Sequence, residues 1–499
     1  MVDIVINSVS ESYIQIQANN SILQELSDIF TFDVPNARFS PSYKKKHWDG
    51  KIRLLNLRNR TILSGLIHKI LEYAKEGNYE VEDNTELSST QEISLEEVNE
   101  FTKTLGLPTQ FEIRDYQIRG VALGIRHKRC VLISPTASGK SLIAYILTRY
   151  YGVKTLIVVP TISLVNQLIG DFKEYGYEGD VHGVTGGIEK HTNLDITVST
   201  WQSIYEQDED FFSGFELMIG DEAHLFAAKS LISVMTKMTN TIYRIGMTGT
   251  LDGSLVNELV LTGLFGPVEK LASTSELIAD KTLADLKIKI LLLKHNKDIT
   301  KPLIGEGYFV ERDYLVGSKS RNTFIKNLAL SLTGNTLILF ALVEKHGREL
   351  HRIIAEKRPE RLYYVSGEVD KDDRNDIRRM VEESKDAIVV ASYGVFSTGI
   401  NIKRIHNIIF ASPAKSRIRV MQSIGRGLRR GDAEFEKLLK EDVTIFDIAD
   451  DLSFPNNVKK NHTLLHLIER IKMYNSESFP YVIHTIKIKD SDNGKSFVS

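Results

Sequence analysis

Ten short apolar runs, in two successive series of five, narrow the class of fold open to this chain. The first series lies at 130–134, 155–160, 196–200, 217–221 and 242–247, and the second at 336–340, 361–365, 387–391, 408–411 and 443–447. Continuous apolar runs are typical of strands buried on both faces, and strands that alternate with helices form parallel sheets. The sequence therefore predicts two tandem α/β domains, each built around a parallel sheet.

The composition is that of a large folded protein with more than one core. Of the 499 residues, 42% are hydrophobic and 26% are charged, which are ordinary values for globular proteins. At about 150 residues per domain, the length predicts three or four domains. The 63 Lys and Arg residues nearly balance the 65 Asp and Glu residues. Any affinity for nucleic acid must therefore come from local basic patches rather than from the charge of the whole molecule.

Three further features bear on the compartment. The single cysteine, Cys130, excludes an intramolecular disulfide and a multi-cysteine metal site. The first residues, MVDIVINSVS, have neither the basic start nor the apolar core of a signal peptide. The longest apolar stretches are far shorter than the ~18–20 residues of a membrane span. We therefore expect a cytoplasmic protein without a membrane partner.

The regions that flank the two series predict smaller accessory parts. Alternating isoleucines near the N-terminus predict strands, and the apolar spacing over 21–30 predicts a helix. Residues 76–102 contain nine Asp or Glu and no Lys or Arg, which predicts a linker or solvated edge and a domain boundary. We accordingly predict an N-terminal α+β domain with its acidic linker at 1–105, α/β domains at 106–280 and 281–450, and a helical tail at 451–499.

The segment 134–141, with the sequence SPTASGKS, follows a predicted strand and opens a predicted helix. This context is typical of a phosphate-binding loop, in which backbone N–H groups at the start of a helix face the phosphates. Lys140 would reach the β- and γ-phosphates of a nucleotide, and Ser141 would bind Mg²⁺. The first position is Ser134, where the strict pattern has glycine. The residues expected to surround the phosphates are Thr136, Ala137, Ser138 and Gly139.

Two acidic residues, Asp221 and Glu222, end an apolar run of the first series. A carboxylate at the carboxyl end of a parallel strand lies where ligands bind in such sheets. Asp221 would share Mg²⁺ with Ser141, and Glu222 would orient the attacking water. His224 would link the nucleotide site to the next strand. Without a phosphate-binding loop, such an acidic pair would be an ordinary solvated strand end.

The second series contains an arginine-rich segment, QSIGRGLR, at 422–429. Arginines that face a γ-phosphate stabilise transition-state charge and accelerate hydrolysis by roughly 10³–10⁵-fold. Arg426 and Arg429 are the candidates for this role. The alternative is a basic, solvated helix face.

Cations and aromatic residues interleave in the N-terminal region, where residues 36–60 carry eight Lys or Arg and one Asp. Cations neutralise phosphates and aromatic rings stack on bases, so this stretch predicts a nucleic-acid contact. The alternative is a strand pair with Trp48 in its core and merely solvated lysines. Elsewhere, Thr161, Thr200 and Ser392 follow strands and would contact phosphates without reading bases. The N-terminal residues expected to bind are Lys44, Lys45, Lys46, Trp48, Lys51 and Arg53.

Seven motifs between residues 111 and 450 resemble, in order, those of superfamily-two helicases of the DEAH type. In the first series they are the adenine-reading segment and motifs I, Ia, II and III, at 114–117, 134–141, 159–161, 221–224 and 248–250. In the second series, motif V lies at 397–401 and motif VI at 422–429. The resemblance implies two RecA-like motor domains that use ATP and Mg²⁺.

The resemblance also implies roles for residues outside the loop and the acidic pair. Arg114 and Gln117 would hold the adenine base, while Gly399 and Asn401 would contact the nucleotide and Thr398 the nucleic acid. Asn401 departs from the family pattern, since many relatives have an acid there. The residues expected to couple hydrolysis to the grip on DNA are His224, Thr248, Gly249, Thr250 and Gln422.

Stretches at 46–55, 364–370 and 391–399 resemble, more narrowly, the UvsW family of recombination helicases from large tailed phages. That resemblance covers nearly the whole chain. It implies an ATP-dependent DNA helicase that acts on branched DNA through junction migration, fork regression and the unwinding of R-loops or D-loops. Such an enzyme would serve phage recombination, repair and replication as a monomer in the host cytoplasm, with RNA met in hybrids.

Three other functions are compatible with the same motifs. An RNA helicase would use the same backbone contacts, which do not read the base. A translocating subunit of a restriction system would need a nuclease elsewhere, since no nuclease pattern is visible in the flanks. An ATP-gated annealing module would hydrolyse ATP without displacing a strand.

Overall fold

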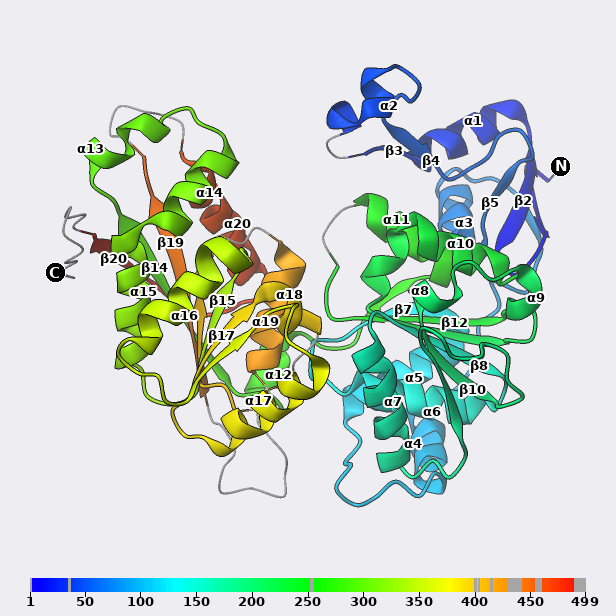
Figure 1. Cartoon of the computed structure of the whole chain (residues 1–499). Helices are drawn as coiled ribbons and strands as arrows, with labels where there is room; N and C mark the ends of the chain where they lie inside the picture. The colour runs from blue at the N-terminus through cyan, green and yellow to red at the C-terminus, as the bar shows by residue number, and fades with distance from the viewer. Residues whose placement is uncertain are drawn as a thin grey trace. The chain divides into compact units, whose positions relative to one another are not determined.

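A computed structural model of the chain describes residues 2–34, 37–251, 255–398, 402, 404–412, 416–428, 442–453 and 460–488 (Figure 1). The chain divides into two compact units. The first contains Met1–Pro135 and Gly139–Ala272, and the second contains Thr136–Ser138 and Ser273–Ser499. No helix in the described ranges is long and apolar enough to cross a membrane.

The first unit is built on a seven-stranded parallel sheet in the order β13-β7-β12-β11-β8-β10-β9. All five predicted strands of the first series are present, and two short ones are added at the edges. The strands are β7 (Arg129–Ile133), β8 (Thr155–Val159), β9 (Val181–Val184), β10 (Ile196–Thr200), β11 (Leu217–Asp221), β12 (Tyr243–Thr248) and β13 (Val268–Lys270). Their helices are α5 (Asp115–His127), α6 (Lys140–Tyr151), α7 (Ile162–Glu174), α8 (Trp201–Ile204), α9 (Glu209–Phe212), η3 (Ala223–Ala227), α10 (Lys229–Lys237) and α11 (Leu255–Phe265).

The N-terminal part forms a four-stranded mixed sheet, β5-β2-β1-β6, which confirms the predicted small α+β domain. Its elements are β1 (Ile4–Ser8), β2 (Tyr13–Ala18), α1 (Asn20–Ile29), β5 (Thr61–Leu63), η2 (Ser64–Leu66), α3 (Ile67–Glu76) and β6 (Val81–Asn84). A separate antiparallel pair, β3 (Thr31–Asp33) and β4 (Lys51–Arg53), encloses η1 (Ala37–Phe39) and α2 (Pro41–Lys44). The basic stretch of the sequence therefore forms a distinct excursion from the N-terminal sheet.

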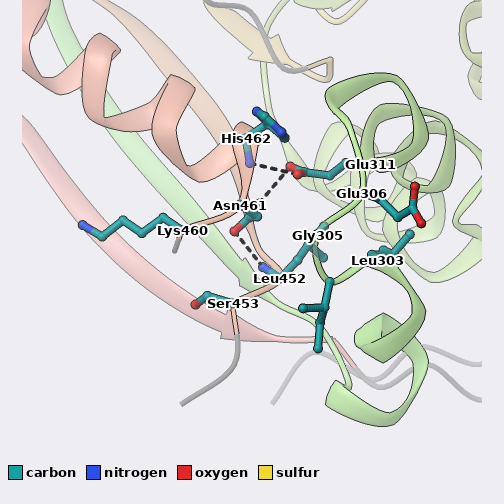
Figure 2. Close-up of a pocket in the computed structure, with 10 residues that line it drawn as sticks. Leu303, Gly305, Glu306, Glu311, Leu452, Ser453, Lys460, Asn461 and His462 are labelled. Carbon is teal, nitrogen blue, oxygen red and sulfur yellow. Dashed lines mark hydrogen bonds between the residues drawn. The ribbon is translucent and has the colours of Figure 1, made fainter. Parts of the chain in front are cut away.

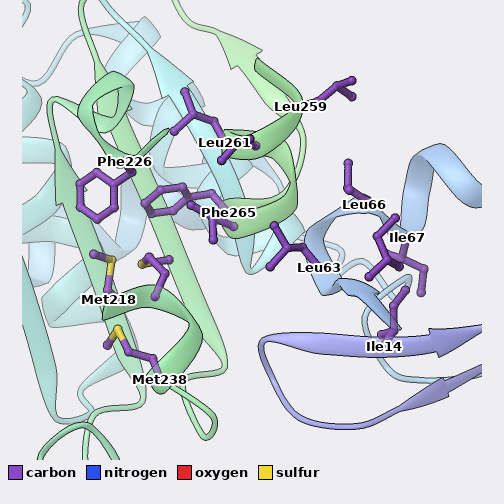
Figure 3. Packing of buried hydrophobic residues seen from close by; sticks show 14 of the residues in the cluster. Ile14, Leu63, Leu66, Ile67, Met218, Phe226, Met238, Leu259, Leu261 and Phe265 are labelled. Carbon is purple, nitrogen blue, oxygen red and sulfur yellow. The ribbon is translucent and has the colours of Figure 1, made fainter. Parts of the chain in front are cut away.

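The N-terminal sheet shares one apolar core with α11 of the same unit. Figure 3 shows Leu63 directed toward Leu261 and Phe265, all of which are buried. The two backbones approach so closely that a Cβ on Gly65 would lie 2.2 Å from the carbonyl oxygen of Thr262. Only glycine fits there, so the packing of η2 against α11 depends on this residue.

The acidic segment is more ordered than the predicted linker. Its first part supplies β6, which pairs in parallel with β1. Its second part forms α4 (Leu95–Thr104), which begins with a reciprocal capping box between Ser94 and Glu97 and buries Val98. The charge pattern correctly indicates solvent on one side, but apolar residues on the other side are packed against α5. Of the two predicted alternatives, the linker was therefore wrong for this stretch and the solvated edge fits it.

The second unit contains another seven-stranded parallel sheet, in the order β16-β17-β15-β18-β19-β14-β20. The five predicted strands are again confirmed. The strands are β14 (Asp285–Lys294), β15 (Thr336–Phe340), β16 (Leu362–Val365), β17 (Ile388–Ser392), β18 (Asn407–Phe410), β19 (Asp442–Asp451) and β20 (Tyr481–Lys487). The helices are α12 (Thr274–Ala279), α13 (Lys297–Thr300), η4 (Lys301–Leu303), α14 (Tyr308–Gly317), α15 (Lys319–Ser331), η5 (Val343–Gly347), α16 (Arg348–Ala355), α17 (Lys371–Glu383), α18 (Tyr393–Thr398), α19 (Arg417–Gly427) and α20 (His462–Ser476).

The C-terminal tail is part of this second unit. The predicted helix is confirmed as α20, and its Arg470 forms a buried ion pair of 2.8 Å with Asp447 of β19. The chain then returns as β20, which pairs in parallel with β14 and was not predicted. The tail therefore extends the second sheet as well as supplying a helix.

Candidate functional site

Three neighbouring strands of the first sheet end at the predicted catalytic residues. In the sheet order, β12 lies between β7 and β11. Because the pairing is parallel, their carboxyl ends meet at one edge. Segment 134–141 follows β7, Thr248 ends β12, and Asp221 ends β11. This is the edge at which α/β sheets bind their ligands.

The loop after β7 curls back and leads directly into α6. Ala137 and Gly139 both have positive φ angles, of 71° and 78°. A Cβ at residue 139 would lie 2.4 Å from Nε2 of Gln117, so glycine permits the close approach of α5 to the loop. The ammonium group of Lys140 donates to the carbonyl oxygens of Ser134 at 3.2 Å and Pro135 at 3.3 Å. The Lys140 side chain is therefore held by backbone carbonyl oxygens at the start of the same loop.

The acidic motif occupies a tight turn after β11. Glu222 adopts a left-handed backbone with a φ of 51°. Burial, together with the negative charge of Glu222, raises the pKa of Asp221 to about 6, while the nearby ammonium group of Lys140 opposes the shift. Lys140 and Asp221, 81 positions apart by their residue numbers, therefore act on one another electrostatically.

Thr248 connects the acidic motif to the loop after β7. Its hydroxyl lies 2.9 Å from Nδ1 of His224 and donates to the carbonyl oxygen of Thr250 at 3.0 Å. Its own carbonyl oxygen accepts from the N–H of Ser134 at 2.9 Å. Nδ1 of His224 also lies 3.4 Å from a carboxylate oxygen of Glu222. The acidic turn and the loop after β7 are therefore joined by hydrogen bonds through the end of β12.

The adenine-reading candidates are at the start of α5. Arg114 is the N-cap, and its N–H donates to Oε1 of Gln117 at 2.9 Å. Gln117 is buried, and its Nε2 lies 3.5 Å from the carbonyl oxygen of Gly139. Ser141, the predicted Mg²⁺ ligand, forms a 2.8 Å hydrogen bond with the hydroxyl of Tyr175. Sequence reasoning missed Tyr175, which lies at the end of α7 and has no motif of its own.

Several predicted residues of the second unit can be placed on its elements. Ser392 ends β17, and its hydroxyl accepts from the N–H of Val395 at 3.4 Å. Thr398 is the last residue of α18. Gln422 and Arg426 both lie on α19, one helical turn apart and half-buried. The predicted residues Gly399, Asn401 and Arg429 lie outside the described residues.

The predicted nucleic-acid residues of the N-terminal excursion are exposed, apart from Trp48. Lys44 ends α2, Lys45 and Lys46 follow it, and Lys51 and Arg53 lie on β4. Arg53 is paired with Asp49 at 2.5 Å. Trp48 is half-buried, and its indole N–H donates to the carbonyl oxygen of Lys51 at 2.7 Å.

Sequence reasoning considered Tyr43 and Trp48 in this excursion but missed a third aromatic residue. Phe39 is 62% exposed, and the guanidinium of Arg38 lies 5.0 Å from its ring centroid. The signal was present as an arginine beside an aromatic residue within the basic stretch.

The predicted hydroxyl contacts of the first unit differ in exposure. Thr161 caps α7 and is half-buried. Thr200 is buried, and its hydroxyl lies 2.9 Å from that of Ser203. Any contact between Thr200 and a phosphate would therefore have to be made by its backbone.

Three family models match successive parts of the chain. Residues 3–83 match the N-terminal domain of DNA helicase UvsW, residues 84–253 the res subunit of type III restriction enzymes, and residues 320–431 the helicase conserved C-terminal domain.

Individual helicases and translocases match more of the chain than any one family model does. The ATP-dependent DNA helicase uvsW of Enterobacteria phage T4 is 33% identical, over 96% of this chain and 98% of its own. The DNA 3'-5' translocase XPB2 of Sulfurisphaera tokodaii is 28% identical, over 67% of this chain and 82% of its own. The crystal structure of T4 UvsW covers 97% of this chain, with a TM-score of 0.50 and 32% identity. On this identity across nearly the whole of both chains, the protein belongs to the superfamily-two helicases and, within them, to the UvsW family.

Proposed function

We propose that this chain is an ATP-driven DNA helicase that acts on branched DNA, by migrating junctions, regressing forks and unwinding R-loops or D-loops in phage recombination, repair and replication. The observation that carries the proposal is the convergence of Lys140, Asp221 and Glu222 at one sheet edge, where Lys140 and Asp221 interact electrostatically. The match to a phage DNA helicase over nearly the whole chain supports the choice of substrate.

The residues at this edge are chemically suited to ATP and Mg²⁺. The first turn of α6 presents backbone N–H groups that lack partners within the helix, and its dipole favours an anion. Bound ATP would supply the phosphoanhydride bond whose hydrolysis drives movement. Lys140 would leave its loop carbonyls for the β- and γ-phosphates, and Glu222 would orient the attacking water. The proposed ligands of Mg²⁺ are Ser141 and Asp221, an oxygen pair of the kind that this cation prefers.

The remaining nucleotide contacts in the proposal come from both series of motifs. Arg114 and Gln117 would position the base, while Gly399 and Asn401 would contact the nucleotide. Arg426 and Arg429 would stabilise the transition-state charge. The loop residues proposed to surround the phosphates are Thr136, Ala137, Ser138 and Gly139.

Hydrolysis would be coupled to the grip on DNA through the link between His224 and Thr248. That hydrogen bond joins the turn that would hold the attacking water to the end of the neighbouring strand. The other residues proposed to take part in coupling are Gly249, Thr250 and Gln422.

The exposed lysines of the N-terminal excursion would bind the DNA backbone near the branch. Their charges neutralise phosphates without reading sequence, which suits an enzyme that recognises shape. Phe39 and Trp48 would add ring contacts. Thr161, Thr200, Ser392 and Thr398 would hold the strand along the motor. A monomer in the host cytoplasm is the proposed working form.

A second candidate is the translocating subunit of a restriction system. It is favoured by the match of residues 84–253 to the res subunit of type III restriction enzymes. Such a subunit would move along duplex DNA and would not need a branch.

The deciding experiment measures ATP hydrolysis without nucleic acid and with single-stranded DNA, duplex DNA, a four-way junction and RNA. Salt is held constant, because phosphate-driven affinity falls steeply as salt rises. We expect the junction to stimulate most, together with displacement of a strand. Stimulation by plain duplex without displacement would favour the restriction motor, and stimulation by RNA alone would indicate an RNA helicase. ATP turnover without displacement on any substrate would indicate an annealing module.

A further inference from the structure

The start of α14 in the second unit presents an unusual group of apolar side chains to solvent. Phe309 is 69% exposed, the highest value among the large exposed hydrophobic residues of the described chain, and Val310 next to it is 46% exposed. Tyr308 is half-buried, with its ring centroid 5.0 Å from that of His466 on α20. Leu465, on the same helix as His466, is 42% exposed. We call Tyr308, Phe309 and Val310 the α14 aromatic surface.

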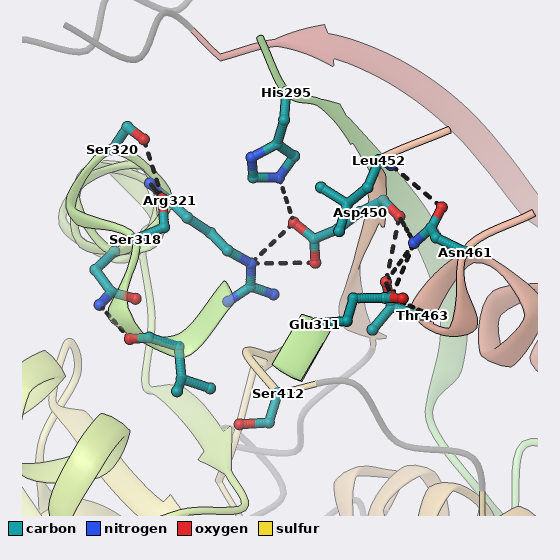
Figure 4. Close-up of polar contacts among 12 residues, drawn as sticks. His295, Glu311, Ser318, Ser320, Arg321, Ser412, Asp450, Leu452, Asn461 and Thr463 are labelled. Atoms are coloured by element: carbon teal, nitrogen blue, oxygen red, sulfur yellow. Dashed lines mark hydrogen bonds and ion pairs between the residues drawn. The ribbon is translucent and has the colours of Figure 1, made fainter. Parts of the chain in front are cut away.

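A buried carboxylate holds this surface in place. Glu311 follows the surface directly and is only 4% exposed. Its oxygens accept hydrogen bonds from the N–H groups of His462 at 2.8 Å and Thr463 at 2.6 Å, and from the side chain of Asn461 at 2.9 Å (Figures 2 and 4). Glu311 thereby caps the N-terminus of α20, because its negative charge accepts hydrogen bonds from the first N–H groups of the helix. The first turn of α14 is therefore fixed to α20, although its outer side chains face water.

The charges around the α14 aromatic surface favour a polyanion. Exposed or half-exposed cations outnumber exposed or half-exposed carboxylates, with Lys301, Arg312, Lys345 and Lys460 against Glu306, Asp313 and Glu344. The guanidinium of Arg312 lies 5.1 Å from the ring centroid of Phe309, and Asp313 pairs with Arg312 and Lys345. Lys460 lines a cavity of about 210 Å³ together with Glu311 and Leu303 (Figure 2). A cation beside an exposed ring is the combination that binds unpaired bases and their phosphates.

The position of the α14 aromatic surface in the second unit also suits a nucleic-acid strand as the ligand. Residues 295–307 connect the carboxyl end of β14 to α14, and α20 follows the carboxyl end of β19. The strands of this sheet are parallel, so Ser392, at the end of β17, lies on the same edge. That edge is where the motor is proposed to hold its strand.

We propose that the α14 aromatic surface stacks against the bases of an unpaired DNA strand, with Phe309 as the principal stacking residue. The inference rests on the proposed function, because it takes DNA as the ligand. It adds a base-contacting surface to the second motor domain, beside the backbone contacts at its strand ends. Stacking accepts every base, so it would hold a separated strand without sequence preference.

The test uses the full chain and a fluorescently labelled thymidine oligonucleotide at fixed salt. Phe309→Ala should weaken binding about tenfold, as expected for the loss of one ring–base stack. Phe309→Trp should retain the affinity, and its added indole emission should be quenched when the oligonucleotide binds. Val482→Ala is the matched control, since Val482 is 58% exposed on β20 of the same unit, and it should bind as the parent does.

Unchanged affinity of Phe309→Ala, or no added quenching in Phe309→Trp at saturating oligonucleotide, would overturn the proposal. An equal loss in Phe309→Ala and Val482→Ala would overturn it as well, since the effect would not be specific to the ring. Failure of the proposed function has a different signature, because the unmodified chain would then show no DNA-stimulated ATP hydrolysis.

Discussion

At the scale of single residues, the proposed nucleotide site depends on which charges face one another. Glu222 and Asp221 are adjacent in sequence, yet their surroundings assign them different tasks. Both side chains are half-buried, but Asp221 lies near the charge of Lys140, which suits a metal ligand, whereas Glu222 is 21% exposed in its side chain beside His224. A residue that orients water needs this access.

Glu222→Gln removes the carboxylate but keeps the shape of the side chain. We expect DNA-stimulated ATP hydrolysis to fall by about 10²–10⁴-fold, the usual contribution of a positioned base, while DNA binding remains. Lys140→Ala should also abolish hydrolysis and leave DNA binding largely intact. Steady-state ATPase assays and oligonucleotide binding check both variants. Glu216→Gln, an exposed position just before β11, is the matched control. Full turnover by Glu222→Gln or Lys140→Ala would refute the site.

Thr248→Val removes the hydroxyl that bonds with His224 and Thr250. The side-chain volume is kept, so we expect ATP hydrolysis within about threefold of the parent and strand displacement reduced about tenfold, since a lost buried hydrogen bond is worth roughly 1 kcal/mol or more. The control is Thr197→Val in β10, a buried hydroxyl for which the described residues provide no partner. Equal losses of hydrolysis and displacement in Thr248→Val would argue against a coupling role.

At the scale of elements, the carboxyl edge of the second sheet is built on buried polar contacts. Asp450 near the end of β19 accepts from Nε of Arg321 at 2.9 Å and lies 2.9 Å from Nε2 of His295 (Figure 4). Burial opposes its ionisation, but the charge of Arg321 and the contact with His295 hold its pKa at about 2. The helices around this edge are therefore positioned by polar contacts as well as by apolar packing.

His346 in the π-helical turn η5 gives this edge a pH dependence. The ring lies 2.9 Å from the hydroxyl of Ser412 and 3.2 Å from Oδ1 of Asn322. The N–H of Ala341 donates to the same Ser412 oxygen. The Ser412 hydroxyl can therefore donate its proton to Nδ1 of His346, while Nε2–H donates to Oδ1 of Asn322. A neutral imidazole satisfies both contacts. Burial and the charge of Arg321 lower the pKa of His346 to about 3, against a smaller opposing effect of Asp450.

Because the pKa of His346 is lower in the folded than in the unfolded chain, the unfolded state binds more protons between about pH 6.5 and about pH 3. Its contribution to stability is therefore full above about pH 6.5 and falls as the pH drops toward about 3, by up to about 1.4 kcal/mol per pH unit. We expect His346→Gln to have a smaller decrease in unfolding free energy between about pH 7 and about pH 4.5 than the parent. Urea unfolding measures this difference, with the exposed His484→Gln as control. Parallel pH profiles would contradict the assignment.

At the scale of the whole molecule, the N-terminal domain and the first motor domain form a single unit. Arg129, the first residue of β7, donates to the carbonyl oxygen of Glu11 at 2.6 Å and to the hydroxyl of Ser64 at 2.9 Å. It also forms an ion pair with the carboxylate of Glu11. Arg244 on β12 donates to the hydroxyl of Ser12 at 2.9 Å. The amino ends of two strands that lead to the proposed nucleotide site thus hold the N-terminal sheet.

Arg129→Met breaks this attachment and leaves the Glu11 carboxylate without its ion pair. Loss of one partner of a fully buried pair costs about 3–5 kcal/mol. The Glu11 side chain is 30% exposed, so we expect a smaller cost, seen as a lower unfolding midpoint for the first unit and little change for the second. Calorimetry combined with limited proteolysis distinguishes the units. Arg53→Met, which removes the exposed pair with Asp49, should not change the midpoint, because exposed pairs contribute little. Release of a stable N-terminal fragment from the unmodified chain would show that the two parts are independent.

The ten predicted strands were recoverable because burial on both faces leaves a continuous apolar run in the sequence. Not every missed strand lacks that signal, since β14 alternates buried and exposed residues over 286–290 and continues as an apolar run to Leu293, yet it was not predicted as a strand. Other missed strands do lack it. In β20, for example, Val482, Ile483 and His484 are all exposed, so neither an apolar run nor an alternating pattern marks it. The acidic stretch 76–102 was interpreted as a possible linker for a related reason. Its charged residues lie on the solvent-exposed face of α4, whereas Val98 is buried on the opposite face. The nucleotide-site residues stay predictions, drawn from motif order and from their positions at strand ends.

By itself, the sequence determined the two parallel sheets, the small N-terminal domain, the C-terminal helix and the resemblance to helicases, because these depend on local periodicity and on residues close together in the chain. The tertiary structure alone decided which distant groups meet. Arg129 and Glu11 are 118 residues apart, and Glu311 caps a helix whose first residue, His462, is 151 positions further along the chain. Such contacts form only when the whole chain folds, so no local sequence pattern predicts them. The α14 aromatic surface is of this kind, since exposed and buried phenylalanines look alike in a sequence.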